Sequence, residues 1–420
     1  MAAPTLNCII NFSTGASFGA ALLLDEGLLD FNVLADAASV IVDVSNQVQA
    51  VSVQRGRNAN ADQFQAGTAS IRIADVNGDF NPENLSSPYA GLLSPLRKVT
   101  LNATDNNTSI IYPLFAGYIT GYNFTQAQVV GEVSYTTLTA IDGFRLLNMG
   151  NVATVAGATA GQLSGARANS ILDAIAWPSS MRDVDPGLTT LSSDPGTTRT
   201  ALAALQTVEL SEYGAVYMDA YGNVVFQDRA LTSSSIGGSS TIFADDGTGI
   251  QYQNVRWVLD DSLVYNSASI TATGLATQTA INQPSIDKYF LHSYNKSDLL
   301  MQTTAVALDY AQAYVASRQE TSVRCDSVTL LDLNTVGYDA GIAAALSLDY
   351  FDTITVKSTQ PASTGTSTLN KTLQIFGVNY NITPTRWSTT FVTLEPILDA
   401  LILDNALYGE LDNDTSVLSY

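Results

Sequence analysis

A short acidic run offers the first side chains that could do chemistry in this sequence. Asp75, Asn77 and Asp79 alternate along the chain, as the first ligands of an EF-hand calcium loop do. The run departs from that loop because its glycine comes at position 78, and because Ser86 stands where the twelfth-position glutamate is needed. Asn77-Gly78 is also a strong turn signal. We therefore predict a turn here in preference to a metal site.

A nucleophilic triad would have to use His292, the only histidine of the chain. The segment Gly161-Gln-Leu-Ser-Gly165 places Ser164 one position late for a G-x-S-x-G nucleophile elbow. His292 stands among Tyr289, Phe290 and Tyr294, which favours a packed imidazole. The parts of a triad are therefore not assembled in the sequence.

Paired carboxylates are the remaining candidates, because two of them flanking a sugar could cleave a glycosidic bond. The four carboxylates considered are Glu209, Glu212, Asp219 and Asp228. With 39 acidic residues, some carboxylates will lie close together without any role in catalysis. Glu212 precedes Tyr213-Gly214, so we expect it to close a helix at the surface. Walker A, dinucleotide-binding and zinc spacings are also missing, and we predict no catalytic, cofactor-binding or metal-binding residues.

Composition and charge argue against nucleic-acid binding. The chain has 420 residues, of which 46% are hydrophobic and only 14% charged, and its net charge is −21. Arg97-Lys98 is the only adjacent basic pair, whereas a nucleic-acid-binding surface needs a basic stripe.

Cys8 and Cys325 have no metal or redox spacing, so we predict two buried free thiols. The run Ala20–Leu24 is too short for a membrane span, and the N-terminus lacks the basic region of a secretory signal.

The elements that must position these side chains include a β-module that occurs twice. Four strand-like segments recur in the same order, at offsets of 257, 255, 260 and 253 residues. The four pairs are Ile73–Asn77 and Leu330–Asn334, Val99–Leu101 and Ile354–Val356, Phe115–Tyr118 and Ile375–Val378, and Tyr135–Leu138 and Ser388–Phe391. Such internal repetition is the signature of a duplicated unit. Gly117 and Gly377 occupy equivalent places in it, and we expect each to mark a bend in a strand more than a subunit contact.

The repeat predicts a mainly β chain with a small α+β insert, made of two antiparallel β-barrel or β-sandwich modules. We place the first module at residues 1–147, the insert at 148–230, the second module with one helix at 231–396, and a C-terminal arm at 397–420. Apolar spacing predicts helices over 167–177, 198–212 and 303–318, and a hairpin over 215–226. Thr303 or Thr304 is the expected N-cap of the third helix.

Several passages resemble the tail-hub or minor tail proteins of long-tailed, siphovirus-like bacteriophages. The likeness is spread over nearly the whole chain, and none of its words is a catalytic signature. The passages are Val53–Arg57, Phe64–Ala69, Asp79–Pro82, Ser87–Tyr89, Leu96–Val99, Pro113–Gly117, Ile171–Pro178, Ser211–Gly214, Phe226–Arg229, Trp387–Thr390, Leu403-Asp404 and Gly409–Asp412.

This resemblance implies two tail-tube-like modules and a homotrimeric ring at the distal end of the virion tail. Such a hub would cap or extend the tube, scaffold tip or fibre proteins, and pass the tape-measure protein and the genome during ejection. Its partners would be the distal tail protein or tail tube, without specific nucleic-acid binding. Three chains would carry three times −21, or −63, either facing the lumen, where it repels DNA, or serving solubility outside.

Two other functions stay open at this stage: a phage adhesin that binds the host receptor, and a tail-associated cell-wall hydrolase. Exposed aromatic clusters on loops would favour the adhesin, and activity dependent on Glu209 or Glu212 would favour the hydrolase. Trp387 falls opposite Ser134 in the repeat, so we expect it to mark where the modules meet different neighbours. Its removal should then impair ring assembly and leave the folding of one chain intact.

Overall fold

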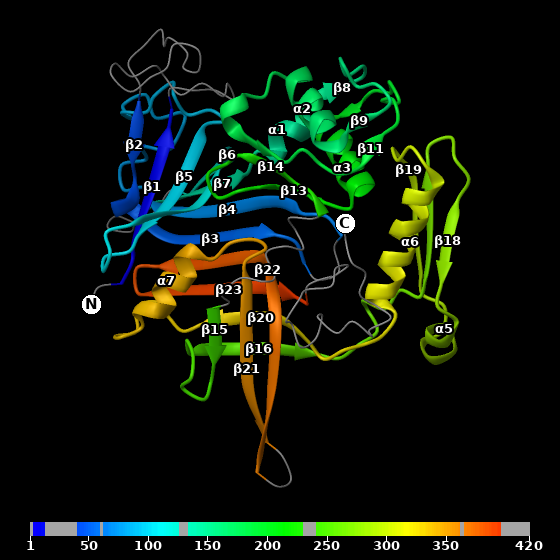
Figure 1. Cartoon of the computed structure of the whole chain (residues 1–420). Helices are drawn as coiled ribbons and strands as arrows, with labels where there is room; N and C mark the ends of the chain where they lie inside the picture. The colour runs from blue at the N-terminus through cyan, green and yellow to red at the C-terminus, as the bar shows by residue number, and fades with distance from the viewer. Residues whose placement is uncertain are drawn as a thin grey trace.

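Strands dominate the computed structural model of the chain (Figure 1), which describes residues 3–12, 40–58, 62–125, 133–229, 241–361 and 365–395. The expected C-terminal arm at 397–420 and the two passages of resemblance within it lie outside these residues, as does Ala20–Leu24. In the described part of the chain, none of the helices combines the length and the apolar character that a membrane crossing requires.

Thirteen strands form one large sheet, which is mostly antiparallel. Its main path runs β16-β20-β23-β22-β3-β4-β7-β6-β5-β1-β2, with β21 beside β22 and β15 beside β21. The first group of strands is β1 (Thr5–Asn11), β2 (Ile41–Asp43), β3 (Val48–Gly56), β4 (Gln65–Ala74), β5 (Lys98–Thr104), β6 (Ile111–Thr125) and β7 (Tyr135–Ile141). The second group is β15 (Thr241–Ala244), β16 (Tyr252–Val258), β20 (Arg324–Leu330), β21 (Thr353–Pro361), β22 (Thr366–Thr383) and β23 (Arg386–Leu394), with helix α7 (Asp339–Ser347) between β20 and β21.

The sheet confirms the mainly β character, but the barrel, one of the two module forms expected, is not found among the described residues, where the main path of the sheet stays open from β16 to β2. The pairing of β3 of the first group with β22 of the second makes both groups part of one sheet. The alternation predicted for 69–73 is present, with every second residue of β4 buried. In Figure 1, β21 and the first half of β22 extend downward from this sheet as a long antiparallel hairpin.

The strand order confirms the predicted repeat. Strands β3-β4-β7-β6-β5 and strands β16-β20-β23-β22-β21 follow the same path, and every neighbouring pair in both is antiparallel. Leu138 of β7 lies opposite Ile71 and Tyr122, whereas Phe391 of β23 lies opposite Val328 and Val378. Matching these positions gives offsets of 257 for β4 and β20 and of 253 for β7 and β23, as the sequence predicted.

The offset predicted for β6 and β22 is wrong by four residues. Both strands carry a bulge, between Ile119 and Gly121 in β6 and between Ile375 and Gly377 in β22. These bulges lie opposite equivalent residues of β7 and β23, so the partner of Gly377 in the repeat is Gly121, at an offset of 256, and not Gly117. The bend expected at Gly377 is therefore confirmed as a bulge. The sequence comparison had aligned Gly377 with the wrong glycine, because Gly117 and Gly121 stand in similar apolar segments.

A helical insert follows β7. Its elements are α1 (Phe144–Met149), β8 (Asn151–Val152), β9 (Gln162–Leu163), α2 (Ser164–Ala174), β10 (Arg182–Val184), β11 (Thr190–Leu191), β12 (Arg199–Thr200), α3 (Ala201–Glu212), β13 (Ala215–Met218) and β14 (Val224–Gln227). The predicted helices at 167–177 and 198–212 are confirmed as α2 and α3, and the predicted hairpin as β13 and β14. Thr200 caps α3 by accepting a hydrogen bond from the Ala203 amide.

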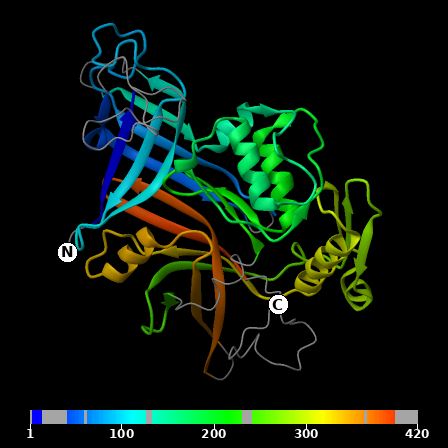
Figure 2. The ribbon, with the colours of Figure 1, turned by 45° about the horizontal axis from the view of Figure 1, so that its top comes forward.

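A smaller unit lies between β16 and β20 in the sequence. It comprises β17 (Ser267–Ala272), β18 (Gln278–Ile281), α5 (Gln283–Tyr289), β19 (Ser293–Leu299) and α6 (Thr304–Arg318). Helix α6 is the third predicted helix, and Thr303 is its N-cap. It packs on its own three-stranded sheet around tyrosines, whereas the sequence had indicated only a helix within a β-module. In Figures 1 and 2 this unit lies beside the insert, and Ser211 Oγ accepts the Leu300 amide 2.9 Å away.

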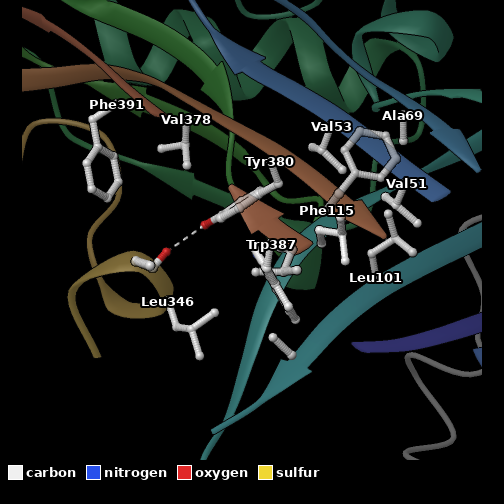
Figure 3. Packing of buried hydrophobic residues seen from close by; sticks show 14 of the residues in the cluster. Val51, Val53, Ala69, Leu101, Phe115, Leu346, Val378, Tyr380, Trp387 and Phe391 are labelled. Atoms are coloured by element: carbon white, nitrogen blue, oxygen red, sulfur yellow. Dashed lines mark hydrogen bonds between the residues drawn. The ribbon is translucent and has the colours of Figure 1, made fainter. Parts of the chain in front are cut away.

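One cluster of buried apolar side chains packs against the large sheet and includes residues from both groups of strands. Figure 3 shows side chains of β3, β5 and β6 beside Tyr380 and Trp387 of β22 and β23, with Leu346 of α7 close to them. The Tyr380 hydroxyl donates a hydrogen bond to the Ala345 carbonyl 3.1 Å away, which fixes α7 to the sheet. The two groups therefore share a core, and they hold each other in place through buried apolar area.

Candidate functional site: the junction of the two modules and the insert

The two groups of strands meet where β3 pairs with the C-terminal half of β22. Gly56 lies opposite Gly377, and the pairing continues to Val51 opposite Ile382. Gly56 has φ +104°, a region that L side chains rarely adopt. A Cβ at Gly56 would lie 2.2 Å from the Phe376 carbonyl oxygen and 2.4 Å from the Gly377 Cα. The junction therefore begins at a point that only glycine fits.

Arg55 joins the two groups through an ion pair in which the arginine is buried and the aspartate is partly exposed. Its guanidinium contacts the Asp349 carboxylate at 3.0 Å, and only 4% of the Arg55 side chain is exposed. The same guanidinium donates to the Leu114 carbonyl at 3.4 Å and lies 4.9 Å from the centre of the Tyr350 ring. A single side chain of β3 thus contacts β6 of its own group and the loop before β21 of the other.

Arg57 lies on aromatic rings at the same junction. Its guanidinium is 4.3 Å from the centre of the Phe376 ring and 5.5 Å from that of Phe64, and it donates to the Asp62 carbonyl at 2.7 Å. Burial, together with the nearby Arg318, lowers the pKa of Arg57 to about 10. The guanidinium remains charged near neutral pH, held by cation–π contacts and by a backbone acceptor.

Phe64 connects all three parts of the chain. Its ring centre lies 5.2 Å from that of Tyr217 in the insert, and 5.0 and 5.6 Å from those of Tyr350 and Phe351 beside β21. Phe64 itself precedes β4 and is 3% exposed. Offset and tilted aromatic pairs of this kind add directional contacts to the burial of apolar area.

Two buried carboxylates complete the junction. Glu209 of α3 accepts hydrogen bonds from the Val216 amide at 2.9 Å and from the Gln63 side chain at 2.8 Å, and so links the insert to the first group of strands. Asp142 accepts the amides of Gly67 and Phe144. Burial raises the pKa of each carboxyl to about 7, although these donors favour the ionised form.

We expect the stability of the chain to fall as the pH rises through neutrality. The pKa of Glu209 is higher in the folded chain than its ordinary value of 4.5, so its stabilising effect is complete below pH 4.5 and is lost as the pH rises through about 7. At 1.36 kcal/mol for each unit, the change for Glu209 is about 3 kcal/mol. Asp142 adds a change of the same sign.

The free energy of unfolding of Glu209→Gln and of the parent chain, measured by urea denaturation from about pH 5 to pH 8, tests this expectation. The variant should show a shallower decline with pH, because glutamine does not titrate and the substitution removes the contribution of Glu209. Parallel profiles of the two proteins would contradict the assignment to Glu209.

Gly56→Ala should weaken the junction, because the added Cβ meets backbone atoms that cannot turn away. We expect a loss of about 2 kcal/mol or more, from positive φ and from the displacement of β22. Gly91→Ala is the matched control, since Gly91 also has positive φ but its Cβ would meet nothing within 4 Å. Equal losses in thermal unfolding of the two variants would show that the close approach has no effect of its own.

The acidic run lies in a turn, as predicted. The Asp75 carboxylate accepts the Asp79 amide at 2.6 Å, the Phe80 amide at 3.2 Å and the Thr136 hydroxyl at 2.8 Å. Gly78 has φ +67° in the turn that these bonds close. The side chain of Asp75 thus ties the end of β4 to the start of β7.

Ser164 and His292 have separate partners. The Ser164 hydroxyl donates to Glu212 at 2.7 Å. The His292 Nε2 lies 3.1 Å from the Tyr289 carbonyl oxygen and 3.8 Å from the Asp261 carboxylate. These contacts do not bring Ser164 and His292 together, so the two are not parts of one triad.

Two of the remaining carboxylates, Glu212 and Asp219, accept hydrogen bonds from backbone amides. Glu212 accepts the Leu188 amide at 3.1 Å and the Thr189 amide at 2.7 Å and is fully buried, so the prediction that it lies at the surface is wrong. It ends α3 while fastening the loop before β11, a long-range contact that local sequence does not indicate. Asp219 accepts the Asn223 amide at 2.7 Å in the turn between β13 and β14. Asp228 is also buried, and its amide donates to Asp185 at 3.1 Å.

Trp387 lies in the core of the large sheet and is only 3% exposed (Figure 3). Its amide donates to the Asp332 carboxylate at 2.9 Å, and its carbonyl accepts the Leu333 amide. Trp387 is therefore a core residue of the single chain, and its role in ring assembly stays a prediction. Cys8 and Cys325 are confirmed as buried free thiols, and burial raises their pKa values to about 12 and about 11.

Sequence reasoning did not assign a role to Arg55, Arg57, Gln63 or Asp349. A usable signal was present, because Arg55-Gly-Arg57 places two cations around a glycine in a chain with only 18 basic residues. Their acidic and aromatic partners come from distant parts of the sequence, so the spacing alone could not identify the junction.

No protein-family model and no curated protein sequence matches the chain. Solved structures do match the chain. A tail protein from Neisseria meningitidis MC58 superposes with a TM-score of 0.55 at 10% identity, covering 94% of this chain and 96% of the other. The 43 kDa tail protein of prophage MuSo2 from Shewanella oneidensis superposes with a TM-score of 0.53 at 12% identity, covering 86% and 97%.

The chain therefore shares its fold with phage tail proteins over most of its length. At these identities the likeness concerns the fold, and it confirms the resemblance read from the sequence at that level.

Proposed function

We propose that this chain is a structural protein of the tail tip of a long-tailed bacteriophage, in which three copies form a ring-shaped hub. Residues 1–147 and 231–396 act as two tail-tube-like modules, and residues 148–230 form the insert between them. The ring caps or extends the tail tube at the distal end of the virion. It also scaffolds the tip or fibre proteins and lets the tape-measure protein and the genome pass.

The equal strand order of the two modules is the observation that supports this proposal most directly. Two equivalent five-strand units in each chain give six units in a trimer, which matches a six-fold tube while the ring itself is three-fold. The junction supports the same role, since Arg55, Phe64 and Glu209 fix one module against the other and against the insert. A rigid angle between modules is what a closed ring requires.

The proposed role is mechanical and not enzymatic. Three of the four candidate carboxylates, Glu209, Glu212 and Asp219, accept hydrogen bonds from backbone amides within the insert. Peptidoglycan zymography with the full chain provides the check. Clearing that disappears in Glu212→Gln, while the variant still folds, would contradict the mechanical role.

The mass of the oligomer in solution and the location of the chain in assembled tails test the proposal. We expect a trimer with a central hole, seen by light scattering and by electron microscopy, either in the purified chain or in assembled tails. A tag on the chain should locate three copies at the distal end of each tail. A different copy number, or a chain absent from tails, would overturn the hub assignment.

A further inference from the structure

Each module has one strand edge that is unpaired in the described part of the chain, although the equivalent edge of the other module is paired in the internal junction. Within the chain, β3 of the first module pairs with residues 377–382 of β22 in the second. The repeat makes β16 the equivalent of β3, and makes residues 121–125 of β6 the equivalent of residues 377–381 of β22. In the part of the chain that the structure describes, β16 pairs with β20 alone, and β6 beyond Ile119 pairs with β7 alone.

The equivalence of β3 and β16 extends to their irregularities. The register shift between Val48 and Ala50 on β3 has its counterpart between Tyr252 and Asn254 on β16. Val51 lies opposite Ile71, and Val255 lies opposite Val328, which are equivalent residues of β4 and β20. Residues 252–256 therefore correspond to residues 48–52, at a constant offset of 204.

The side chains at the two unpaired edges differ from their counterparts in the internal junction. Phe124 is 43% exposed, whereas its counterpart Tyr380 is 2% exposed in the shared core. Val255 of β16 is half-buried, whereas its counterpart Val51 is 2% exposed. Apolar side chains at these edges are thus more exposed than their counterparts in the internal junction.

Neither edge carries the features that prevent strands from pairing. The segment Thr120–Thr125 has no charged residue and no proline, and Arg256 is the only charged residue of β16. Exposed edges in soluble proteins are usually blocked by lysine, proline or inward-facing charges. An unblocked edge equivalent to a paired one is a strand-addition site.

We propose that β16 of one chain pairs antiparallel with residues 121–125 of β6 in a second copy of this chain, and so repeats between chains the junction that β3 and β22 make within one. The register of the internal junction places Arg256, the counterpart of Ser52, opposite Thr125, the counterpart of Asn381. The inference rests on the proposed ring, for which it supplies the interface.

The geometry of this contact is head-to-tail. Each chain offers one β16 edge and one β6 edge, so contacts between chains alternate with junctions inside chains around the ring. In Figure 1, β16 lies at the lower end of the sheet and β6 near its top, so one chain can serve two neighbours at once. A heterologous contact of this kind closes when its rotation divides the circle, and three chains then give six junctions of one type.

Disulfide cross-linking in the full chain tests the register. The double variant Thr125→Cys/Arg256→Cys, oxidised in the purified protein and in assembled tails, should give covalent species up to three chains. Directly opposed residues of antiparallel strands lie within the span of a disulfide. Thr125→Cys/Asn254→Cys, shifted by two residues, is the matched control and should cross-link far less. The native thiols are buried and should not compete.

Blocking the edge gives a second, independent readout. Phe124→Lys should reduce trimer formation at least tenfold in light scattering while leaving the melting temperature of the single chain unchanged. Ile281→Lys is the control, because Ile281 is 60% exposed on β18, an edge strand of another sheet.

The outcomes separate this inference from the proposed function. A trimer that forms without the Thr125–Arg256 cross-link, or that survives Phe124→Lys, would overturn the strand pairing and leave the hub standing. Chains that stay single both in solution and in tails would overturn the pairing and the hub together.

Discussion

Asp349→Ala should destabilise the folded chain by about 3–5 kcal/mol, because it leaves the Arg55 guanidinium buried without its carboxylate partner. Only 4% of the Arg55 side chain is exposed, whereas 38% of Asp349 is, so the uncompensated charge lies on the arginine. The ion pair also spans the two modules, since Arg55 is on β3 and Asp349 precedes β21. Denaturant unfolding of the purified variant gives the loss directly.

A double variant separates this charge effect from a simple loss of packing. Arg55→Met/Asp349→Ala removes both charges and keeps a long apolar side chain, so it should recover much of the lost stability. Glu320→Ala is the matched control, because its pair with Lys288 is exposed and should contribute nothing measurable. If the double variant is as unstable as Asp349→Ala, the buried charge is not the cause.

Trp387→Ala should also destabilise a single chain by about 3–5 kcal/mol, since it removes a large aromatic side chain from a closed core. Trp387 is 3% exposed and packs in the cluster that holds Tyr380 and Leu346 (Figure 3). This result would reverse the expectation from the sequence, in which Trp387 served ring assembly alone. The free energy of unfolding, measured where the chain is a monomer, decides between them.

Two further variants keep this test informative if Trp387→Ala does not fold. Trp387→Phe retains most of the apolar volume and should lose less stability than the alanine variant. Trp257→Ala should lose less as well, because Trp257 is only partly buried at the β16 edge. A Trp387→Ala chain with the unfolding midpoint of the parent, yet unable to form rings, would restore the original interpretation.

Local sequence determined the elements with strong periodicity or clear capping. The helices at α2, α3 and α6 follow apolar residues spaced three and four apart, and Thr303 caps α6 as expected. The turn at Asp75 and the hairpin of β13 and β14 follow from glycine and asparagine at the positions that turns require. These signals are local, so one sequence is enough to read them.

The duplication was also readable, because strand order along the chain is a property of the sequence. Its alignment failed only at Gly377, where two glycines in β6 stand four residues apart in similar surroundings. The bulges that distinguish Gly121 from Gly117 are features of pairing with β7, which no single strand reveals.

Tertiary structure alone decided how the two modules meet. One sheet runs through both because β3 pairs with β22 across more than three hundred residues. The contacts of Arg55, Phe64 and Glu209 also join distant segments, which lie 294, 286 and 146 residues apart in the sequence. The sequence by itself determined that there are two like modules and where their strands and helices lie. Which edges are paired and which remain open depends on register and on long-range packing, and these are set by the folded chain as a whole.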